Sequence, residues 1–418
     1  MAIEQVGKPD FVVEGEVYGL LWGCGIRAEV ERLAEHRDEL TGEVTIYSRR
    51  QPNPGLLHSA RLNLMSTQSR KTLAGELQRR EPDLDWSGLV EQLCFMVRER
   101  YRAGQPSIDM REFIPMVGPR WLHEPFVERD GAALIFADGG TGKTMLAMAV
   151  SASVSTGQDI VGHLHGDAVP VLYVDYEGEE RTFHERLRAI CVGAGIARLP
   201  PIFYRRQVAS LAEAASELRR EVRRVGAGLV IVDSLGAARG GEPESADITI
   251  RTFIAARSLG VPWLALDHVT KAKGNDATKP FGSVFSVNLA RLVWGMDKAQ
   301  DEDSESIVVA LRNTKRNNGR FLPRIGLRIG FECGTNDELR TVRFTHVDLN
   351  GVAGLAEKLP LKERILGELR GGPSTQTELA QTLGTKLETV SARVGELVRS
   401  DRVVRLEDRR VALKARPV

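Results

Sequence analysis

The feature that most constrains the fold is a glycine-rich turn, ADGGTGKT, at residues 137–144. The apolar run ALIFA precedes this turn, and the residues that follow it, TMLAMAVSASVS, carry an apolar stripe with helical spacing. Gly139, Gly140 and Gly142 let the backbone curl so that several N–H groups face one anion. A helix that begins at Lys143 adds the positive end of its dipole. The sequence therefore predicts a phosphate site between a buried strand and a helix.

Different residues of this turn are expected to contact different parts of a nucleoside triphosphate and its metal ion. We expect Lys143 to reach the β- and γ-phosphates and the hydroxyl of Thr144 to bind Mg²⁺. ATP and Mg²⁺ are therefore the predicted ligands. The strict motif has glycine at its first position, where this sequence has Ala137. The predicted nucleotide contacts are Asp138, Gly139, Gly140, Thr141, Gly142, Lys143, Thr144 and Met145.

Strands and helices alternate around this turn, from about residue 126 to residue 350. The runs ALIFA, VLYVD, LVIVD and WLALD are apolar throughout. Parallel strands that are covered on both faces require this pattern. The later runs SIVVALRN, RIGLRIGFE and TVRFTHVDL alternate, as antiparallel strands do, and we expect them to extend the sheet. The predicted fold class is α/β with a mostly parallel sheet.

A chain of 418 residues is long enough for two or three domains. Residues 1–112 predict a small α+β domain of unknown role, in which VTIYS at 44–48 is a strand. Two polar stretches, RAEVERLAEH at 27–36 and SGLVEQLCFMVRERYR at 87–102, predict helices. The nucleotide-binding domain is expected at 113–350, a linker at 351–359 and a third domain at 360–418.

The composition excludes few classes of protein, but it gives an expectation for the compartment in which the chain works. The formal net charge is +1, from 57 Lys and Arg against 56 Asp and Glu, so total charge does not argue for nucleic acid. No window approaches the roughly 18 uninterrupted apolar residues of a membrane span. The N-terminus has no secretion signal, and the four cysteines are scattered without metal-ligand spacing. We predict a cytoplasmic protein without a membrane partner.

Carboxylates follow two of the predicted strands. Asp233 ends the run LVIVD at the sheet edge where ligands bind, and we expect it to join Thr144 at the metal. Glu177 follows the run VLYVD, and a glutamate there can orient and deprotonate the attacking water. Three neighbours remain alternatives for this base: Asp175, Glu179 and Glu180.

Taken together, these motifs resemble those of the RecA-like ATPases, and within them the RepA-type hexameric helicases, which are related to the DnaB-type replicative helicases. The resemblance covers roughly residues 113–335. It implies a RecA-like core, with Glu177 as the catalytic glutamate and Asp233 as the end of the Walker B strand. His268, which ends the run WLALDH, matches the polar sensor of γ-phosphate status.

The same resemblance implies a ring, with a hexamer as the expected assembly. In such rings a lysine and an arginine after a late strand enter the neighbouring subunit's site and neutralise charge on the transferring phosphoryl group. Lys315 and Arg316 are the candidates here. The family places one residue between its two cations, whereas Lys315 and Arg316 are adjacent. Arg312 and Arg320 therefore remain alternative candidates for the cation that enters the neighbouring site.

Nucleic-acid contacts are expected in two glycine-bearing loops, 235–247 and 270–283, which face the channel in RecA-like rings. Their candidate contacts to single-stranded DNA are Arg239, Lys271, Lys273 and Lys279. The three short amphipathic helices and hairpin at 360–418 resemble a winged helix-turn-helix. Residues 387–400 would be its recognition helix, and duplex DNA and a docked protein are equally open as its partner.

The leading hypothesis is an ATP-hydrolysing, ring-forming motor on single-stranded DNA, a replicative-type helicase of a phage, plasmid or similar element. The alternatives are a DNA-dependent ATPase that does not unwind, such as a helicase loader, recombination mediator or recombinase, and an ATP-switched DNA-binding regulator.

Overall fold

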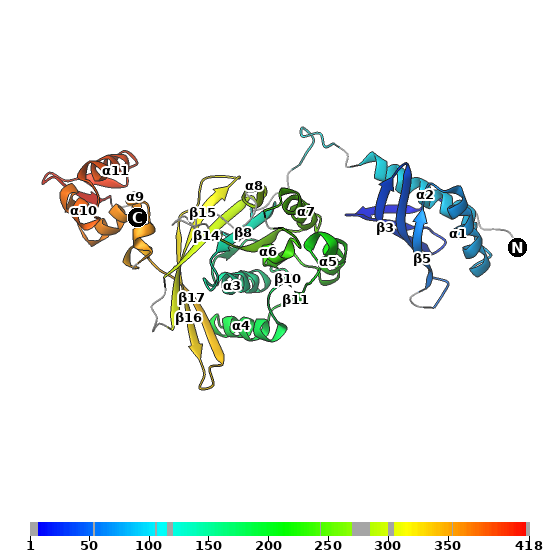
Figure 1. The fold of residues 1–418 in the computed structure, drawn as a ribbon, viewed down its shortest axis with the longest axis horizontal. Coiled ribbons are helices and arrows are strands. Elements are labelled where there is room, and N and C mark those ends of the chain that lie inside the picture. The colour runs from blue at the N-terminus through cyan, green and yellow to red at the C-terminus, as the bar shows by residue number, and fades with distance from the viewer. Residues whose placement is uncertain are drawn as a thin grey trace. The chain divides into compact units, whose positions relative to one another are not determined.

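The computed structural model describes residues 7–52, 55–104, 107–114, 120–242, 244–269, 285–299, 305–352 and 354–414. The chain divides into two compact units, Met1–Val117 and Gly118–Val418, which Figure 1 colours by residue number. Each unit is described by itself below. The finer division into three domains and a linker stays a prediction.

The first unit contains one antiparallel sheet and two helices. The strands lie in chain order, β1-β2-β3-β4-β5. Alternate residues of the sheet and the buried faces of both helices form a single core, with Trp22 and Trp86 among its largest side chains. The strands are β1 Asp10–Glu14, β2 Val17–Leu21, β3 Ile26–His36, β4 Glu39–Ser48 and β5 Leu56–Asn63, and the helices are α1 Thr67–Arg80 and α2 Trp86–Ala103.

The helix predicted at residues 27–36 is wrong. These residues belong to β3, which pairs antiparallel with both β2 and β4. Ala28 and Val30 are buried whereas Arg27 is exposed. This alternation is typical of a strand that has one face in the core and the other exposed to solvent. Tertiary pairing outweighs the helix propensity of the Glu, Arg and Ala residues. The helix predicted at 87–102 is confirmed by α2.

The second unit contains a nine-stranded sheet in the order β11-β10-β12-β13-β8-β14-β15-β16-β17. The first six strands of this order run parallel, and the last three are antiparallel to their neighbours. The parallel strands are β8 Ala132–Ala137, β10 Val171–Asp175, β11 Ile202–Arg206, β12 Leu229–Asp233, β13 Trp263–His268 and β14 Leu292–Ala299. The antiparallel ones are β15 Ser306–Arg316, β16 Ile325–Cys333 and β17 Leu339–His346. The predicted α/β class and the antiparallel extension are confirmed.

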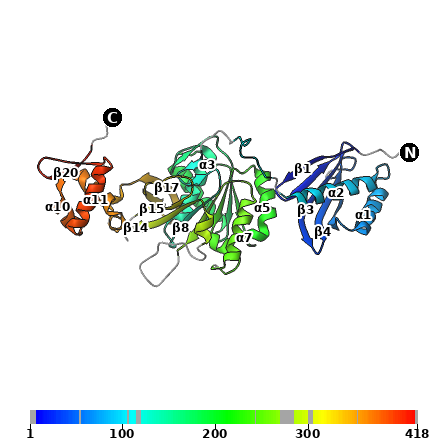
Figure 2. The ribbon, with the colours of Figure 1, turned by 90° about the horizontal axis from the view of Figure 1, so that it is seen from above.

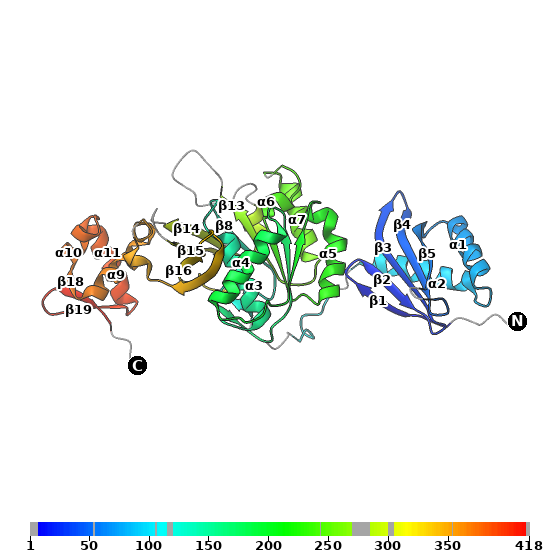
Figure 3. The same ribbon diagram turned by 90° about the horizontal axis from the view of Figure 1, so that it is seen from below.

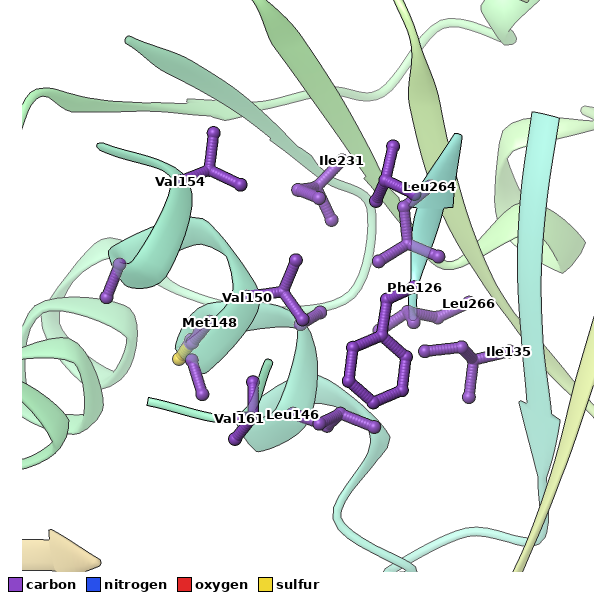
Figure 4. Close-up of a cluster of buried hydrophobic side chains, with 14 of the residues drawn as sticks. Phe126, Ile135, Leu146, Met148, Val150, Val154, Val161, Ile231, Leu264 and Leu266 are labelled. Atoms are coloured by element: carbon purple, nitrogen blue, oxygen red, sulfur yellow. The ribbon is translucent and has the colours of Figure 1, made fainter. Parts of the chain in front are cut away.

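Helices cover both faces of this sheet, as Figures 2 and 3 show from two sides. Ile135 of β8 faces the core shared with α3 and α4, while Leu134 and Phe136 face the core shared with α5 and α7. In Figure 4, Leu146 and Val150 of α3 lie across from the sheet residues of the first core. The helices are α3 Lys143–Thr156, α4 Glu180–Gly193, α5 Leu211–Val225, α6 Leu235–Ala238, α7 Ala246–Arg257 and α8 Phe285–Leu289.

Two smaller substructures complete the second unit. A three-stranded sheet joins β6 Trp121–Glu124, β7 Val127–Glu128 and β9 His163–Leu164. Near the C-terminus, helices α9, α10 and α11 surround a core with the three-stranded sheet β18-β20-β19. These elements are α9 Leu361–Glu368, β18 Ser374–Thr375, α10 Gln376–Thr382, α11 Leu387–Arg399, β19 Val403–Arg405 and β20 Arg410–Leu413.

Within the described ranges, none of the helices combines the length and apolar character that a membrane span requires.

Candidate active site

The carboxyl ends of four neighbouring parallel strands bring the predicted site residues to one edge of the sheet. Asp233 of β12 pairs with Asp175 of β10 on one side and with Leu266 of β13 on the other. His268 of β13 pairs with Ala137 of β8, where the glycine-rich turn begins. The turn, the Asp233 strand end and the His268 strand end therefore lie at the same edge of the sheet, with His268 two residues beyond the position paired with Asp233.

The turn leaves its backbone open where an anion is expected. Asp138, Gly139 and Gly140 are exposed, and α3 begins at Lys143. A helix leaves the N–H groups of its first turn without intrahelical acceptors, so these groups are available to phosphate oxygens. The side chain of Met145 packs against the core, so only its backbone can contact the nucleotide.

Gly142 is required at its position for two reasons. Its φ is +94°, and a Cβ there would lie 3.1 Å from Cδ1 of both Ile307 and Ile329. Gly140 also has a positive φ, +66°. The hydroxyl of Thr141 closes the turn by donating to the carbonyl of Asp138 at 2.7 Å. Side chains below the turn thus fix its shape.

Lys143 lies against the turn that it is expected to serve. Its Nζ donates to the carbonyls of Ala137 and Asp138, at 2.8 and 2.9 Å. Burial lowers the pKa of Lys143, and the carboxylates of Asp233 and Glu177 oppose this effect. The ammonium group is therefore held beside the exposed N–H groups of the turn, where a phosphate would meet both.

Thr144 and Asp233 form the pair expected at the metal. Thr144 Oγ1 donates to Asp233 Oδ2 at 2.9 Å, and the hydroxyl of Tyr173 donates to the same oxygen at 2.8 Å. Asp233 is 6% exposed, and burial raises its pKa to about 6. A hydroxyl and a carboxylate beside a phosphate turn are the hard oxygen ligands that Mg²⁺ takes together with phosphates and water. These two residues fit Mg²⁺.

The described residues hold no cluster of three or more His, Cys, Asp or Glu side chains suited to a metal. In nucleotide sites Mg²⁺ commonly takes most of its ligands from phosphate and water.

Glu177 is the carboxylate best placed to act as a base. Its side chain is 50% exposed, and its Oε1 lies 3.6 Å from His268 Nε2. The hydroxyl of Ser234, which follows Asp233, donates to the same oxygen. The carboxylate thus faces the site while two neighbours restrict its orientation.

Two of the three alternatives to Glu177 have other partners in the structure. Asp175 is buried and accepts the backbone N–H groups of Glu177 and Gly178, at 2.9 and 2.8 Å, so it shapes the turn that presents Glu177. Glu179 pairs with Arg206. Glu180 lies in the first turn of α4.

Lys315 and Arg316, the pair predicted to serve a neighbouring subunit, both have partners within their own chain. Lys315 Nζ donates to the carbonyls of Val287, Asn288 and Ala290, at 2.8, 2.7 and 2.7 Å. Its three donors are therefore used within its own chain. Arg316 pairs with Glu128 at 3.3 Å, and its guanidinium lies 4.9 Å from the ring centroid of Trp121. The two open alternatives differ, since Arg312 is half-buried and Arg320 is exposed.

Arg239, predicted as a nucleic-acid contact, is buried in this structure. Its side chain is 0% exposed and donates to Asp267 Oδ2 at 2.8 Å and to Ser286 Oγ at 2.7 Å. The other three candidates, Lys271, Lys273 and Lys279, lie outside the described residues, and so does the whole loop at 270–283 that carries them.

Two site residues escaped the sequence analysis. Lys298 of β14 donates from Nζ to the carbonyl of Gly140 in the turn, at 3.2 Å. In sequence it looks like ordinary surface charge, and only the pairing of β14 with β8 brings it to the turn. Tyr173 looked like a core aromatic, and no local signal distinguished its hydrogen bond to Asp233.

This sheet and this turn have the architecture of a P-loop nucleotide-binding domain. Residues 108–274 match the family model described as an AAA domain. None of the curated proteins matches the chain in sequence. Among solved structures, a KaiC-like protein from the hyperthermophilic archaeon Pyrococcus horikoshii OT3 is similar with 14% identity and a TM-score of 0.37. That match covers 54% of this chain and 94% of the archaeal chain.

Proposed function

We propose that this protein is an ATP-hydrolysing motor that assembles into a ring and moves along single-stranded DNA, as a replicative-type helicase of a phage, plasmid or similar element. The observation that carries the proposal is the shared sheet edge of Lys143, Asp233, Glu177 and His268. The segments that leave β12 and β13 start at this same edge, so a change at the nucleotide is next to both of them.

The chain's own groups supply the elements of phosphoryl transfer. Glu177 accepts the proton of the attacking water, and Ser234 and His268 hold its carboxylate toward the site. Lys143 and the N–H groups at the start of α3 bind the phosphate oxygens. Mg²⁺, when bound at Thr144 and Asp233, neutralises charge on these oxygens.

His268 connects this chemistry to DNA in the proposed motor. It lies 3.6 Å from Glu177, and it ends the strand that leads into the loop at 270–283. Lys271, Lys273 and Lys279 of that loop would contact DNA phosphates without regard to sequence. A change in the hydrogen bonds of His268 upon hydrolysis would then move these contacts along the strand.

A hexameric ring is the assembly we propose. Phosphoryl transfer requires cations around the transition state, and a neighbouring subunit can provide one. With Lys315 and Arg316 engaged in their own chain, Arg320 is the candidate we retain for this role. It is exposed, and its backbone carbonyl accepts a hydrogen bond from Arg316 at 3.1 Å, which anchors the turn that presents it.

For the C-terminal part we propose a winged helix-turn-helix that docks on duplex DNA or on a protein. The order α9, β18, α10, α11, β19, β20 supports this assignment, with α11 as the recognition helix. In the turn between β19 and β20, Arg410 pairs with Asp408. Binding of a labelled duplex by the full chain, with and without ATP, distinguishes a DNA partner from a protein partner.

Steady-state ATPase assays with and without a single-stranded oligonucleotide test the motor. We expect stimulation by the oligonucleotide and unwinding of a forked duplex. Stimulation without unwinding would instead support a loader, recombination mediator or recombinase. Normal nucleotide binding with no stimulation at all would rule out the motor.

A further inference from the structure

A fully buried ion pair between Arg239 and Asp267 lies next to His268, at the carboxyl end of strand β13. Arg239 Nη2 is 2.8 Å from Asp267 Oδ2, and both side chains are 0% exposed. The same nitrogen donates to Ser286 Oγ at 2.7 Å. Arg239 directly follows α6, Asp267 lies in β13 and Ser286 lies in α8. Three segments that are distant in sequence thus meet at one guanidinium group.

A contribution to the stability of the fold does not by itself explain why this ion pair is buried. Removing two charges from water costs free energy that their attraction repays only in part, and packed apolar side chains often serve as well. Burial raises the pKa of Asp267, and the charge of Arg239 opposes that rise. The charge of Arg239 therefore favours the ionised form of this carboxylate.

The second oxygen of this carboxylate contacts the sensor residue. Asp267 Oδ1 accepts the backbone N–H of His268 at 3.0 Å. The imidazole Nε2 of His268 lies 3.6 Å from Glu177 Oε1. One carboxylate therefore holds Arg239 with one oxygen and the backbone of His268 with the other, and His268 in turn lies beside the base.

We propose that Arg239 is a positioning residue for ATP hydrolysis. By fixing Asp267 it sets the backbone at His268, and with it the approach of the imidazole ring to Glu177. The inference rests on the roles that the proposed function gives to Glu177 and His268, and it requires nothing of DNA. Arg239 contacts neither the nucleotide site nor solvent, so its effect is on turnover and not on nucleotide binding.

Arg239→Met tests the proposal in the full chain, with kcat and KM from steady-state ATPase assays and affinity from titration with a fluorescent ATP analogue. We expect kcat to fall at least about tenfold while affinity changes less than about twofold, because small displacements of reacting groups cost turnover. Arg239→Lys keeps the positive charge but lacks the planar guanidinium group that contacts both Asp267 and Ser286, so it should give an intermediate kcat. A wild-type kcat in Arg239→Met overturns the proposal.

The double variant Arg239→Met with Asp267→Leu separates positioning from folding. It removes both charges, so no unpaired carboxylate is left buried and the melting temperature should approach that of the wild type. We expect kcat to stay low in this variant. Recovery of wild-type kcat would show that the pair only maintains packing, and would overturn the proposal even if Arg239→Met alone does not fold.

Arg219→Met is the matched control. Arg219 is 4% exposed and donates to Ser258 Oγ and Ser216 Oγ, both at 2.9 Å, between α5 and the end of α7. It should lose stability without the selective loss of kcat. Glu177→Gln in the same assays tests the proposed function itself. If Glu177→Gln is slow but Arg239→Met is not, the positioning role alone fails, whereas normal hydrolysis by Glu177→Gln means that the base assignment fails.

Discussion

Thr144 and Asp233, 89 positions apart in the chain, are joined by a 2.9 Å hydrogen bond from the hydroxyl to the carboxylate. The first residue opens the helix after the phosphate turn, and the second ends a buried strand. The same carboxylate oxygen accepts the hydroxyl of Tyr173. Two residues from distant parts of the chain thus present a hydroxyl and a carboxylate together, and the protonation of the carboxylate bears on whether a cation can bind there.

We expect the Mg²⁺-dependent part of nucleotide affinity to weaken as pH falls below about 6, because burial raises the pKa of Asp233 to about 6 and the cation requires the ionised form. Titration with a fluorescent ATP analogue, with and without Mg²⁺ across this range, measures the effect. Asp233→Asn should bind weakly at every pH. An equally strong Mg²⁺ dependence on both sides of the transition would contradict the assignment of Asp233.

The same group should make the nucleotide-free chain less stable as pH rises. An ordinary Asp has a pKa of 3.8, against about 6 for Asp233 in the folded chain. Between these values the folded chain binds more protons than the unfolded chain, so the free energy of unfolding contributed by this group falls with rising pH. Urea unfolding of wild type and Asp233→Asn at several pH values isolates this contribution, and the difference between the two chains should grow with pH.

Glu177→Gln should retain ATP binding and slow turnover by at least about 10²-fold, the scale expected for the loss of a general base. Lys143→Ala should abolish hydrolysis. Glu179→Gln is the control, since Glu179 pairs with Arg206. Single-turnover assays with bound ATP separate chemistry from binding. A slow Glu179→Gln beside a normal Glu177→Gln would move the base assignment to Glu179.

Gly142→Ala should destabilise the fold by about 1–3 kcal/mol, because its φ of +94° disfavours a side chain and the added Cβ meets Ile307 and Ile329. It should also weaken nucleotide binding, since the turn cannot keep its shape. Gly139→Ala is the matched control: a Cβ there meets nothing within 4 Å. Thermal unfolding compares the two, and equal losses of stability would mean that the packing beneath Gly142 is not decisive.

Two inactive variants should restore each other if active sites are shared between subunits. Arg320→Ala keeps its own base, and Glu177→Gln keeps its own arginine. Mixed rings would contain sites that combine the intact base of one subunit with the intact arginine of the next. ATPase activity should therefore rise when the two purified variants are mixed. Activity that stays at the sum of the separate variants would argue against Arg320 as a shared cation.

The phosphate turn, the parallel strands and the strand-end residues Asp233, Glu177 and His268 were predictable because their signals are local. A continuous apolar run predicts a strand covered on both faces, and parallel strands place their carboxyl ends at one edge. The placement of Asp233 beside Thr144 follows from that rule alone.

The errors have a common physical cause. A sequence shows that a side chain is charged but not which way it points. Arg239 looked like loop charge and is buried, and Lys315 looked like a free cation and holds three carbonyls. The strand at Ile26–His36 was predicted as a helix because its local propensity favours one, and the partners that override this preference are distant in the chain. Lys298 was missed for the same reason, since only pairing of β14 with β8 brings it to the turn.

Strand β8, which carries the phosphate turn, is hydrogen-bonded to β13 on one side and to β14 on the other. Moving it would break two ladders at once, so the sheet gives the phosphate turn a fixed support. We therefore expect β8 to stay in place whether or not an anion is bound at the turn.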